Sequence, residues 1–296
     1  MAARLRSVDA RRVTSPRRCV LVTGSSSGLG LESAVELAGR GWHVVASMRD
    51  PDRRAALDAR AREAGAGPLD VVALDVTDAD SVKRGVEEAL ELTGGRLDAL
   101  VSNAGTASGG AFEDTDEGEW QRVLDTNLLG AMRVAQRVLP VMRARRSGRL
   151  VLVSSDSARY GNPGLSVYCA SKWALEGWAE SLAYEVEPLG VRVVVVQPGN
   201  YATGIWATAP RISPPGSAYA GLASAVTRFV EEEHLPRSRD PREVGRAVAG
   251  ALEARRPPFR VPVGPDARLA AVLGRLPHRV TAAAVRRVTG LHRWRP

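Results

Sequence analysis

Short apolar runs alternate with longer amphipathic segments along most of this chain. The runs are rich in valine and leucine, which is typical of strands that are buried on both faces of a sheet. They predict strands at residues 19–23, 43–48, 70–74, 97–102, 148–155, 191–197 and 259–263.

Between these runs, apolar residues recur at three- and four-residue steps, which is the period of an amphipathic helix. The predicted helices cover residues 31–39, 52–64, 78–92, 117–145, 165–187 and 242–254. Strands that alternate with helices in this way indicate one α/β domain, a doubly wound parallel sheet of about seven strands.

The alternation breaks down between residues 200 and 239, where prolines and glycines are frequent. Long irregular insertions of this kind are typical of lids beside a site. The apolar side chains of this segment either line a pocket or pack a helix at residues 218–233 onto the core. They are Tyr201, Ile205, Trp206, Ile212, Tyr219 and Phe229.

Both ends of the chain differ in character from the domain predicted for residues 18–264. Residues 265–296 show two short helical patterns, 266–276 and 281–291, with arginines on one side and Leu, Ala and Val on the other. This extension is expected either to pack on the body or on a partner subunit, or to lie on an anionic membrane. Residues 1–17 are basic and predict a disordered tail, or a segment with an interaction or membrane-surface role.

The net charge of +8 is concentrated at these two ends. Residues 1–18 contain six arginines and one acid, and residues 255–296 contain ten arginines and one acid. The remaining central part has 25 basic and 31 acidic residues. A folded middle that is acidic argues against nucleic-acid binding.

Cysteine content and hydropathy indicate the expected location. The chain has two cysteines, Cys19 and Cys169, and no secretory signal pattern, which favours a reducing compartment such as the cytoplasm. No apolar run approaches the ~18–20 residues that cross a bilayer. We therefore expect a soluble cytoplasmic protein, and we expect no metal site.

A glycine-rich segment follows the first predicted strand. It reads G-S-S-S-G-L-G from Gly24 to Gly30 and precedes a helical pattern. Backbone N–H groups at such a helix N-terminus bind phosphate, and the glycines allow its close approach. This context predicts a dinucleotide site at the start of the chain.

The residue types after the second strand indicate which dinucleotide binds. An NAD site usually has an Asp or Glu about twenty residues beyond the glycines, to bind the ribose 2′-hydroxyl. This chain instead has Met48 followed by Arg49. An arginine without that carboxylate favours a 2′-phosphate, and Ser27 can add a hydroxyl, so we expect NADP(H).

Residues 154–172 contain the candidate chemistry. Ser155 ends a buried strand, and Tyr168 and Lys172 are four residues apart on a predicted helix, so they share one face. An ammonium beside a phenol favours the phenolate and is expected to lower the pKa of the tyrosine toward a range useful for proton transfer. Lys172 is one of only two lysines in an arginine-rich chain, which strengthens this interpretation.

Three further polar residues are expected at the same place. Asp75 follows the third predicted strand and Asn103 the fourth, and the carboxyl ends of parallel strands meet at one edge of the sheet. Asn127 is an amide in the middle of a predicted helix, where amides are unfavourable. We expect it to point into the site rather than to solvent.

In combination, these segments resemble the short-chain dehydrogenase/reductase family, which has a single Rossmann domain. The resemblance covers residues 18–263 and depends on T-G-S-S-S-G-L-G from Thr23, L-D-V-T from Leu74, S-N-A-G from Ser102, Asn127, Ser155, Y-x-x-x-K from Tyr168, and Pro198-Gly199. The stretch from Tyr168 to Leu182 is most similar to the branch that acts on hydroxysteroids and retinol. Ser102 departs from the family's usual asparagine at a position that is more structural than chemical.

The resemblance implies a role for each matching position. The implied catalytic residues are Asn127, Ser155, Tyr168 and Lys172. The implied cofactor site comprises Gly24, Ser26, Ser27, Gly28, Leu29, Gly30, Arg49, Asp75, Val76, Asn103, Ala104, Gly105, Tyr168, Lys172, Pro198, Gly199, Tyr201 and Thr203. The substrate is expected to contact Ser155, Tyr160, Leu165, Tyr168 and Trp206.

The function implied is interconversion of a secondary alcohol and a ketone or aldehyde on a largely apolar small molecule, with NADP(H) and with Tyr168 as general acid and base. Two alternatives use the same fold. One is a biosynthetic enzyme for dehydration, epimerisation or cyclisation, and the other is a non-catalytic NADP(H)-binding sensor.

The helices predicted at 117–145 and 165–187 are longer than one sheet face requires. The second presents Trp173 and Trp178 outside the catalytic stripe. Apolar surface of this kind usually finds a symmetric partner, and in the family this helix pair forms the subunit interface. A homodimer or homotetramer is expected, and internal packing of the tryptophans in a monomer is the alternative.

Overall fold

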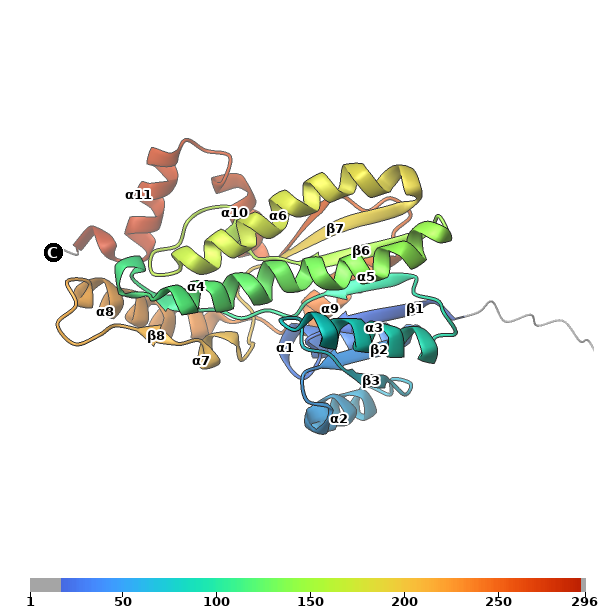
Figure 1. Cartoon of the computed structure of the whole chain (residues 1–296). Helices are drawn as coiled ribbons and strands as arrows, with labels where there is room; N and C mark the ends of the chain where they lie inside the picture. Colours follow the sequence, from blue (N-terminus) through green and yellow to red (C-terminus); the bar gives the residue numbers. More distant parts are fainter. Residues whose placement is uncertain (1–16, 294–296) are drawn as a thin grey trace, which may run out of the picture.

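A computed structural model describes residues 17–293 of the chain, and these residues form one parallel sheet with helices on both faces (Figure 1). The strands of the sheet are β1 (Cys19–Thr23), β2 (His43–Met48), β3 (Asp70–Ala73), β4 (Ala99–Ser102), β6 (Gly148–Val153), β7 (Val191–Pro198) and β9 (Arg260–Val263). Their spatial order is β3-β2-β1-β4-β6-β7-β9. This is the doubly wound α/β fold that the sequence predicts.

Two hydrophobic clusters flank the sheet. One packs α1 (Gly28–Gly39), α2 (Ala55–Glu63) and α9 (Arg242–Glu253) on one face. The other packs α3 (Ala79–Leu92), α5 (Gly130–Ala144) and α6 (Ser166–Val186) on the opposite face. Val20 and Val22 contribute to the first cluster and Leu21 to the second, because successive strand residues point to opposite faces. A strand with both faces covered must be apolar throughout, which explains the continuous apolar runs.

The strand order determines where the site forms. The chain passes from β1 outward to β3, and then returns to place β4 on the other side of β1. Ligands bind at such a reversal, beyond the carboxyl ends of the strands. β1, β4, β6 and β7 are neighbours in space, so the loops that follow them form one continuous edge.

The helix predicted at residues 117–145 is interrupted. It begins as α4 (Glu117–Leu124), continues through a π-helical turn at Asp125–Leu129, and resumes as α5. A π turn inserts one extra residue into a helix and is frequent at functional sites. The sequence pattern predicted the helix but not this turn.

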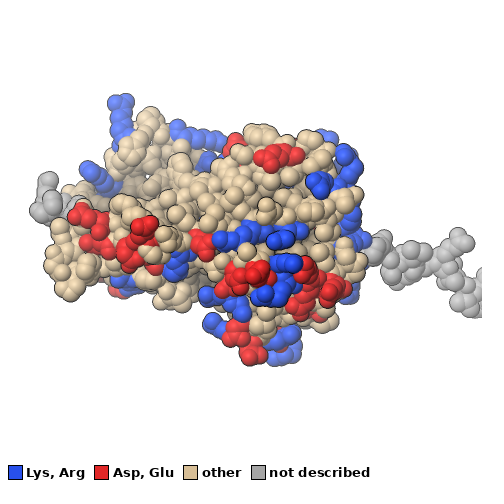
Figure 2. Space-filling model, viewed as in Figure 1, with Lys and Arg blue, Asp and Glu red and all other residues tan. Residues whose placement is uncertain are grey.

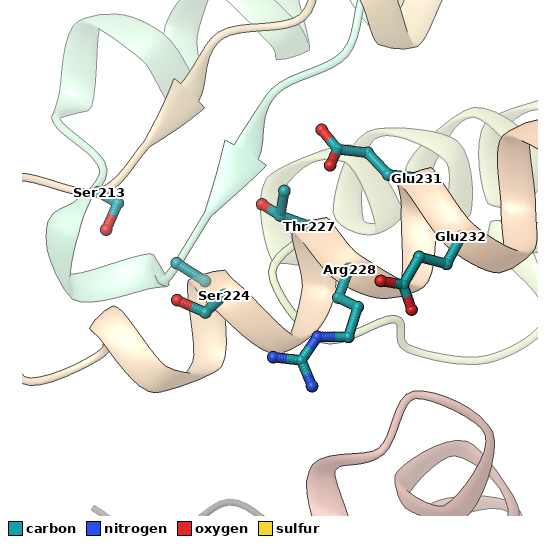
Figure 3. A pocket seen from close by; sticks show the side chains of 7 residues that line it. Ser213, Ser224, Thr227, Arg228, Glu231 and Glu232 are labelled. Atoms are coloured by element: carbon teal, nitrogen blue, oxygen red, sulfur yellow. The ribbon is translucent and has the colours of Figure 1, made fainter.

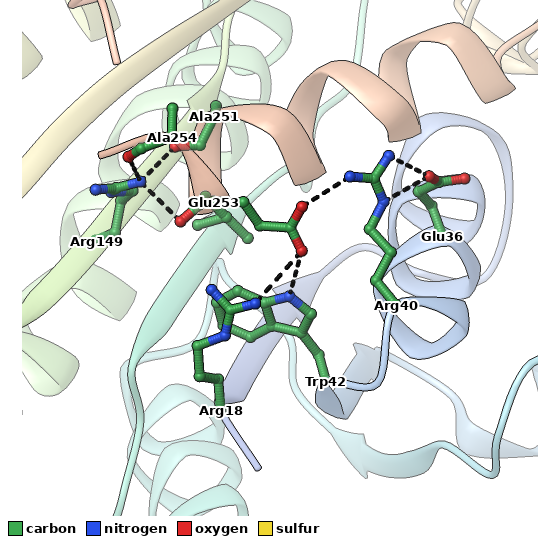
Figure 4. Close-up of polar contacts among 9 residues, drawn as sticks. Arg18, Glu36, Arg40, Trp42, Arg149, Ala251, Glu253 and Ala254 are labelled. Atoms are coloured by element: carbon green, nitrogen blue, oxygen red, sulfur yellow. Dashed lines mark hydrogen bonds and ion pairs between the residues drawn. The ribbon is translucent and has the colours of Figure 1, made fainter. Parts of the chain in front are cut away.

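A cluster of polar contacts holds the end of α9 against the sheet (Figure 4). Glu253 accepts hydrogen bonds from Arg40 at 2.7 Å, from the Trp42 indole at 3.3 Å and from Arg18 at 3.4 Å. Arg149 on β6 donates to the last carbonyls of the helix, those of Ala251, Leu252 and Ala254, at 2.7–2.8 Å. These bonds satisfy carbonyls that a helix end would otherwise leave without partners.

The predicted lid contains α7 (Ile205–Thr208), β8 (Arg211–Ile212) and α8 (Ala220–Arg228), and it lies at the carboxyl end of the sheet (Figure 1). β8 pairs with β5 (Gly109–Gly110), a two-residue strand after β4. Two hydroxyls of the lid also bind acids of the segment before α4: Ser217 donates to Asp114 at 2.6 Å, and Tyr219 to Glu113 at 2.8 Å. The lid is therefore attached across the site.

The C-terminal extension forms α10 (Pro265–Leu273) and α11 (His278–Val288), close to where helices were predicted. None of the helices in residues 17–293 is long and apolar enough to cross a membrane. The predicted tail, residues 1–17, lies outside the described residues except for Arg17, which is exposed.

Candidate functional site

The glycine-rich loop has the shape of a phosphate cradle. Gly24 and Gly28 adopt φ values of +70° and +57°, which favour glycine. A Cβ on Gly30 would lie 2.2 Å from the carbonyl oxygen of Gly24, so only glycine fits where α1 begins. Ser27 is the N-cap residue of α1, but its hydroxyl forms no capping hydrogen bond, and the residue is exposed. The N–H groups of the first turn and a free hydroxyl therefore face the place expected for a dinucleotide.

Asn103 holds this loop against β4. Its amide nitrogen donates to the carbonyls of Thr23 and Gly24 at 3.0 and 3.1 Å, and the Thr23 hydroxyl accepts from the backbone N–H groups of Asn103 and Ala104. The two neighbouring strand ends are thus joined. Because the Asn103 side chain binds the loop, only the backbone beside it can line the pocket.

The predicted cofactor residues meet from distant parts of the chain. A Cβ on Gly28 would lie 3.4 Å from the Thr203 Cβ, so the lid segment faces the loop directly. Arg49 is exposed at the end of β2, on the same edge. One carboxylate oxygen of Asp75 accepts hydrogen bonds from the Thr77 hydroxyl at 2.7 Å and from the Thr77 N–H at 2.9 Å. The donor set, an anion cradle with a serine and an arginine beyond it, fits a dinucleotide that has a 2′-phosphate.

The structure brings the three candidate catalytic side chains together. Tyr168 and Lys172 lie on the buried face of α6, with 5% and 4% of their surface exposed, and Ser155 is 8% exposed at the end of β6. The Lys172 Nζ lies 5.9 Å from the centroid of the Tyr168 ring and donates to the Val153 carbonyl at 3.0 Å. The Ser155 hydroxyl lies close enough to the Tyr168 hydroxyl to act on its pKa. This is the grouping that the sequence predicts.

Asn127 lies in the π-helical turn and is 1% exposed. Its amide nitrogen donates to the Thr106 carbonyl and to the Ser171 hydroxyl, both at 2.9 Å, and its oxygen accepts from the Thr106 N–H at 2.8 Å. A Cβ on Gly105 would lie 3.4 Å from that oxygen and 3.7 Å from the Lys172 Nζ. Asn127 therefore points inward, as expected, and connects the loop after β4 to the turn of α6 that carries Lys172.

The pKa of Tyr168 differs from expectation. Burial raises the pKa of this phenol well above its usual range, and the nearby Ser155 hydroxyl opposes the rise. Burial also lowers the pKa of Lys172 to about 8, while the charge of Glu176 opposes that change. The prediction that Lys172 lowers the pKa of Tyr168 is wrong for the protein without its cofactor. The loss of solvation of the phenol raises this pKa, and the nearby Lys172 ammonium, which binds the Val153 carbonyl, does not offset that rise.

Two acids near Ser155, the candidate catalytic serine, were not predicted. The Ser155 hydroxyl donates to Asp156 at 3.0 Å, and burial together with the charge of Asp266 raises the pKa of Asp156 to about 6, against the hydrogen bond from Ser155. Asp266 comes from the first turn of α10 and accepts a hydrogen bond from the Asn200 N–H. Its second oxygen is buried without a hydrogen-bond partner among the described residues. The only sequence signal was that Asp156 directly follows Ser155.

A third unpredicted acid, Glu176, is 4% exposed and lies one turn after Lys172 on α6. One oxygen accepts from Ser154 at 2.8 Å and from Gln197 at 2.7 Å. The other accepts from Arg260 at 2.9 Å. This carboxylate joins α6 to the ends of β6 and β7 and to β9, and a buried charge of this kind is stable only when it is paired and hydrogen-bonded.

The substrate side of the site is partly apolar. The ring of Trp206 meets Tyr168 edge-on, with 5.5 Å between the ring centroids, and His234 meets Trp206 at 6.3 Å. Tyr160 and Leu165 are half-buried in the loop before α6. Burial raises the pKa of Tyr160 above its usual range and lowers that of His234.

One lid residue lies away from the expected pocket. Tyr201 is 4% exposed within the core beside α9, and its hydroxyl donates to Glu243 at 3.1 Å. Its side chain therefore cannot face a substrate, and only its backbone remains available to a cofactor. Trp206 lies beside Tyr168, as the pocket interpretation expects, whereas Tyr201 packs in the core beside α9, which neither interpretation predicted.

A separate depression lies beside α8 (Figure 3). It is open and mainly polar, and it is lined by Ser213, Ala223, Ser224, Thr227, Arg228, Glu231 and Glu232. None of these is a predicted catalytic or cofactor residue. We assign no role in the site to this depression.

Comparison with known proteins gives consistent matches. A family model described as short chain dehydrogenase matches residues 18–211. Human retinol dehydrogenase 8 is 36% identical over 255 residues, which cover 82% of this chain and 80% of that protein.

Two solved structures are similar over most of their length. A short-chain dehydrogenase from Streptomyces avermitilis is 31% identical, with a TM-score of 0.78, and the match covers 95% of this chain and 98% of that one. A single-residue variant of actinorhodin polyketide ketoreductase, solved with NADPH, is 29% identical, with a TM-score of 0.68, and the match covers 86% of this chain and 92% of that one.

The contacts of Glu176 lead to a prediction about pH. Glu176→Gln removes the charge that opposes the fall in the Lys172 pKa, so the lysine should lose its proton at lower pH than in the unmodified protein. If catalysis needs the ammonium, the alkaline limb of the kcat/KM profile should shift to lower pH. The profile is measured by following NADPH absorbance across pH 6 to 10.

Arg260→Gln is the matched control, because it loosens the same network without removing the carboxylate. Its alkaline limb should not shift to lower pH. Equal shifts in the two variants would show that Glu176 acts only through packing.

Proposed function

Because the chain belongs to the short-chain dehydrogenase/reductase family, we propose that it is an NADP(H)-dependent oxidoreductase of secondary alcohols and ketones or aldehydes. The family and the retinol dehydrogenase-like branch are those that the motifs predicted. An enzyme of this family acts on CH–OH or C=O groups. The observation that carries the proposal is the convergence of Tyr168, Lys172, Ser155 and Asn127 beside the phosphate cradle.

In the proposed mechanism, the Tyr168 hydroxyl gives its proton to the carbonyl oxygen during reduction and removes it during oxidation. The Ser155 hydroxyl donates to the same oxygen and polarises it. A nicotinamide cofactor held at this edge would supply the hydride to the carbonyl carbon during reduction, or would accept it from the alcohol carbon during oxidation. Burial raises the tyrosine pKa in the protein alone, so Tyr168 is held in the protonated form that reduction needs.

Lys172 and Asn127 support this proton transfer. The ammonium is fixed by the Val153 carbonyl, and we propose that it holds the nicotinamide ribose and stabilises charge that develops on Tyr168. Asn127 positions the adjacent backbone of Thr106, and we propose that it anchors a water chain for proton exchange. Asp156 receives the hydrogen bond of Ser155, so its protonation state sets which way that hydroxyl points.

We propose NADP(H) rather than NAD(H) because Arg49 and Ser27 are exposed at the adenosine end of the site. Gly24, Gly28 and Gly30 would hold the pyrophosphate, and Asp75 the adenine. The remaining contacts would come from Ser26, Leu29, Val76, Asn103, Ala104, Gly105, Pro198, Gly199, Thr203 and the backbone of Tyr201. The NADPH in the actinorhodin ketoreductase structure supports this choice.

The proposed substrate is a largely apolar carbonyl compound or alcohol. Trp206, Tyr160 and Leu165 supply apolar surface next to Tyr168 and Ser155. The name of the human relative, a retinol dehydrogenase, is consistent with an apolar substrate.

We further propose that the enzyme is cytoplasmic and assembles through α5 and α6. Both cysteines are buried free thiols, as suits a reducing compartment. The outer surface of the helix pair leaves Trp173 52% and Tyr184 72% exposed. Trp178 instead packs partly into the core, so Trp173 and Tyr184 are the better candidates for a subunit contact.

Tyr168→Phe tests the catalytic proposal. It should lower turnover roughly 10²- to 10⁴-fold, the usual contribution of a general acid, while NADPH still binds. NADPH oxidation with a panel of steroid, retinoid, aliphatic and polyketide carbonyls measures this, with product quantified against NADPH consumed. Tyr160→Phe is the matched control and should keep most of the activity. Undiminished turnover in Tyr168→Phe would disprove the assigned role, and product formed without NADPH loss would indicate redox-neutral chemistry.

Arg49→Ala tests the cofactor choice. Loss of a charge-assisted contact to the 2′-phosphate should weaken NADPH binding about 10- to 100-fold and leave NADH binding nearly unchanged. Titration with each cofactor, followed by fluorescence or calorimetry, measures both constants. Arg53→Ala, an exposed arginine four residues later, is the control. Equal losses for the two cofactors would place Arg49 outside the phosphate site.

Tyr184→Glu tests assembly. Light scattering should give a dimer or tetramer mass for the unmodified chain and a smaller mass for the variant, because burying a new charge at the interface is unfavourable. NADPH affinity should be unchanged in both. A single-chain mass for the unmodified protein, constant on dilution, would contradict the proposed interface.

A further inference from the structure

Exposed apolar side chains are concentrated on the C-terminal helix pair. Of the eleven large hydrophobic side chains exposed in the described part of the chain, five lie between residues 269 and 288. We name these five the C-terminal apolar face: Leu269 (59% exposed), Val272 (56%), Leu276 (41%), Val280 (45%) and Val288 (67%). Isolated exposed apolar residues are ordinary, but a cluster is typical of an interaction surface.

Helical periodicity puts this face outward on α10. Leu269 and Val272 are three residues apart on α10, so they share one side of this helix, and Leu276 follows in the turn between α10 and α11. Ala267 and Ala270 are buried on the opposite side, toward the body of the protein. The alanines are small enough for close packing, and the large residues are the ones left in solvent.

Arginines lie among these apolar residues. Arg268, Arg275, Arg279, Arg286 and Arg287 are all exposed, and none forms an ion pair with any residue that the structure describes. The sequence from residue 267 to the C-terminus contains no Asp or Glu. Figure 2 shows basic side chains projecting at this end of the molecule, where α10 and α11 lie in Figure 1. The helix pair therefore presents apolar and cationic groups together, and its one acid, Asp266, lies in the first turn of α10 and binds the Asn200 N–H.

The helix pair is fixed to the loop that carries the catalytic serine. A Cβ on Gly274 would lie 2.4 Å from the Arg159 carbonyl oxygen, so the end of α10 sits directly on the loop between Ser155 and Tyr160. Asp266 binds the Asn200 N–H, at the start of the lid. The Thr281 hydroxyl donates to the Leu273 carbonyl at 3.0 Å and joins α11 to α10. The apolar face is thus held beside the substrate side of the site.

We propose that α10 and α11 dock this enzyme on the surface of a membrane that contains anionic phospholipids. An interfacial helix inserts large apolar side chains among the acyl chains while arginines bind phosphate headgroups, and both kinds of group are present on the same surface here. A second copy of this chain fits less well, because a symmetric contact would bring unpaired arginines against one another. The surface position would present the substrate side of the site to lipid-dissolved molecules; this last point alone rests on the proposed function.

Vesicle flotation with the full chain tests the proposal. The protein should float with vesicles of phosphatidylglycerol and phosphatidylcholine in equal parts, and much less with phosphatidylcholine alone or at high salt. Leu269→Asp with Val272→Asp should abolish flotation, and Arg279→Gln with Arg286→Gln should weaken it by roughly tenfold or more. Leu92→Asp and the pair Arg62→Gln with Arg84→Gln are matched controls on α2 and α3 that should float normally.

Three outcomes would overturn the proposal: no flotation of the unmodified chain, equal flotation with neutral vesicles, or flotation that survives both sets of changes. If Leu269→Asp lowers the mass measured by light scattering and flotation does not depend on lipid, the C-terminal apolar face contacts a second copy of the chain instead. Turnover of a short water-soluble ketone should be the same in all variants. If the unmodified chain lacks that turnover but floats, the proposed function fails while the membrane contact stands.

Discussion

The buried carboxylate of Glu176 is the interaction on which the arrangement of the site depends. It receives Ser154 from β6, Gln197 from β7 and Arg260 from β9, while its own helix carries Tyr168 and Lys172. Four elements that meet at one edge of the sheet are thereby joined through one side chain. Its charge also offsets part of the loss of solvation at Lys172. A single buried carboxylate therefore contributes both to the geometry of this edge of the sheet and to the electrostatics at Lys172.

The other polar contacts of the site lie around the Glu176 network. Asn103 holds the glycine loop against β4, and Asn127 uses a π-helical turn to reach the backbone of Thr106 from within a helix. Such turns add a residue without ending the helix, so a side chain can point inward while the helix continues across the sheet. Asp156 and Asp266 add two acids beside Ser155. The electrostatic environment of the Ser155 hydroxyl therefore differs from that of a hydroxyl without charged neighbours.

The periphery of the molecule is built differently from its core. The lid is attached to the segment before α4 by two hydrogen bonds and a short strand pair, and α10 packs on the body through the small side chains of Ala267 and Ala270, whereas the sheet is held by continuous apolar packing. The proposed substrate and membrane contacts involve these peripheral segments, which can change without disturbing the packing that forms the carboxyl edge of the sheet.

The sequence by itself predicted the fold class, the strands, the glycine-rich loop and the four candidate catalytic residues, because each leaves a local pattern: an apolar run, glycines before a helix, a tyrosine four residues before a lysine. It did not predict Glu176, Asp156 or Asp266, nor the burial of Tyr201. Those outcomes depend on contacts between residues far apart in the chain, such as Glu176 with Arg260 or Asp266 with Asn200. The pKa of Tyr168 was mispredicted for the same reason. Helical spacing shows that Lys172 lies near Tyr168, but only the packed structure determines how far the phenol is removed from water, which raises its pKa.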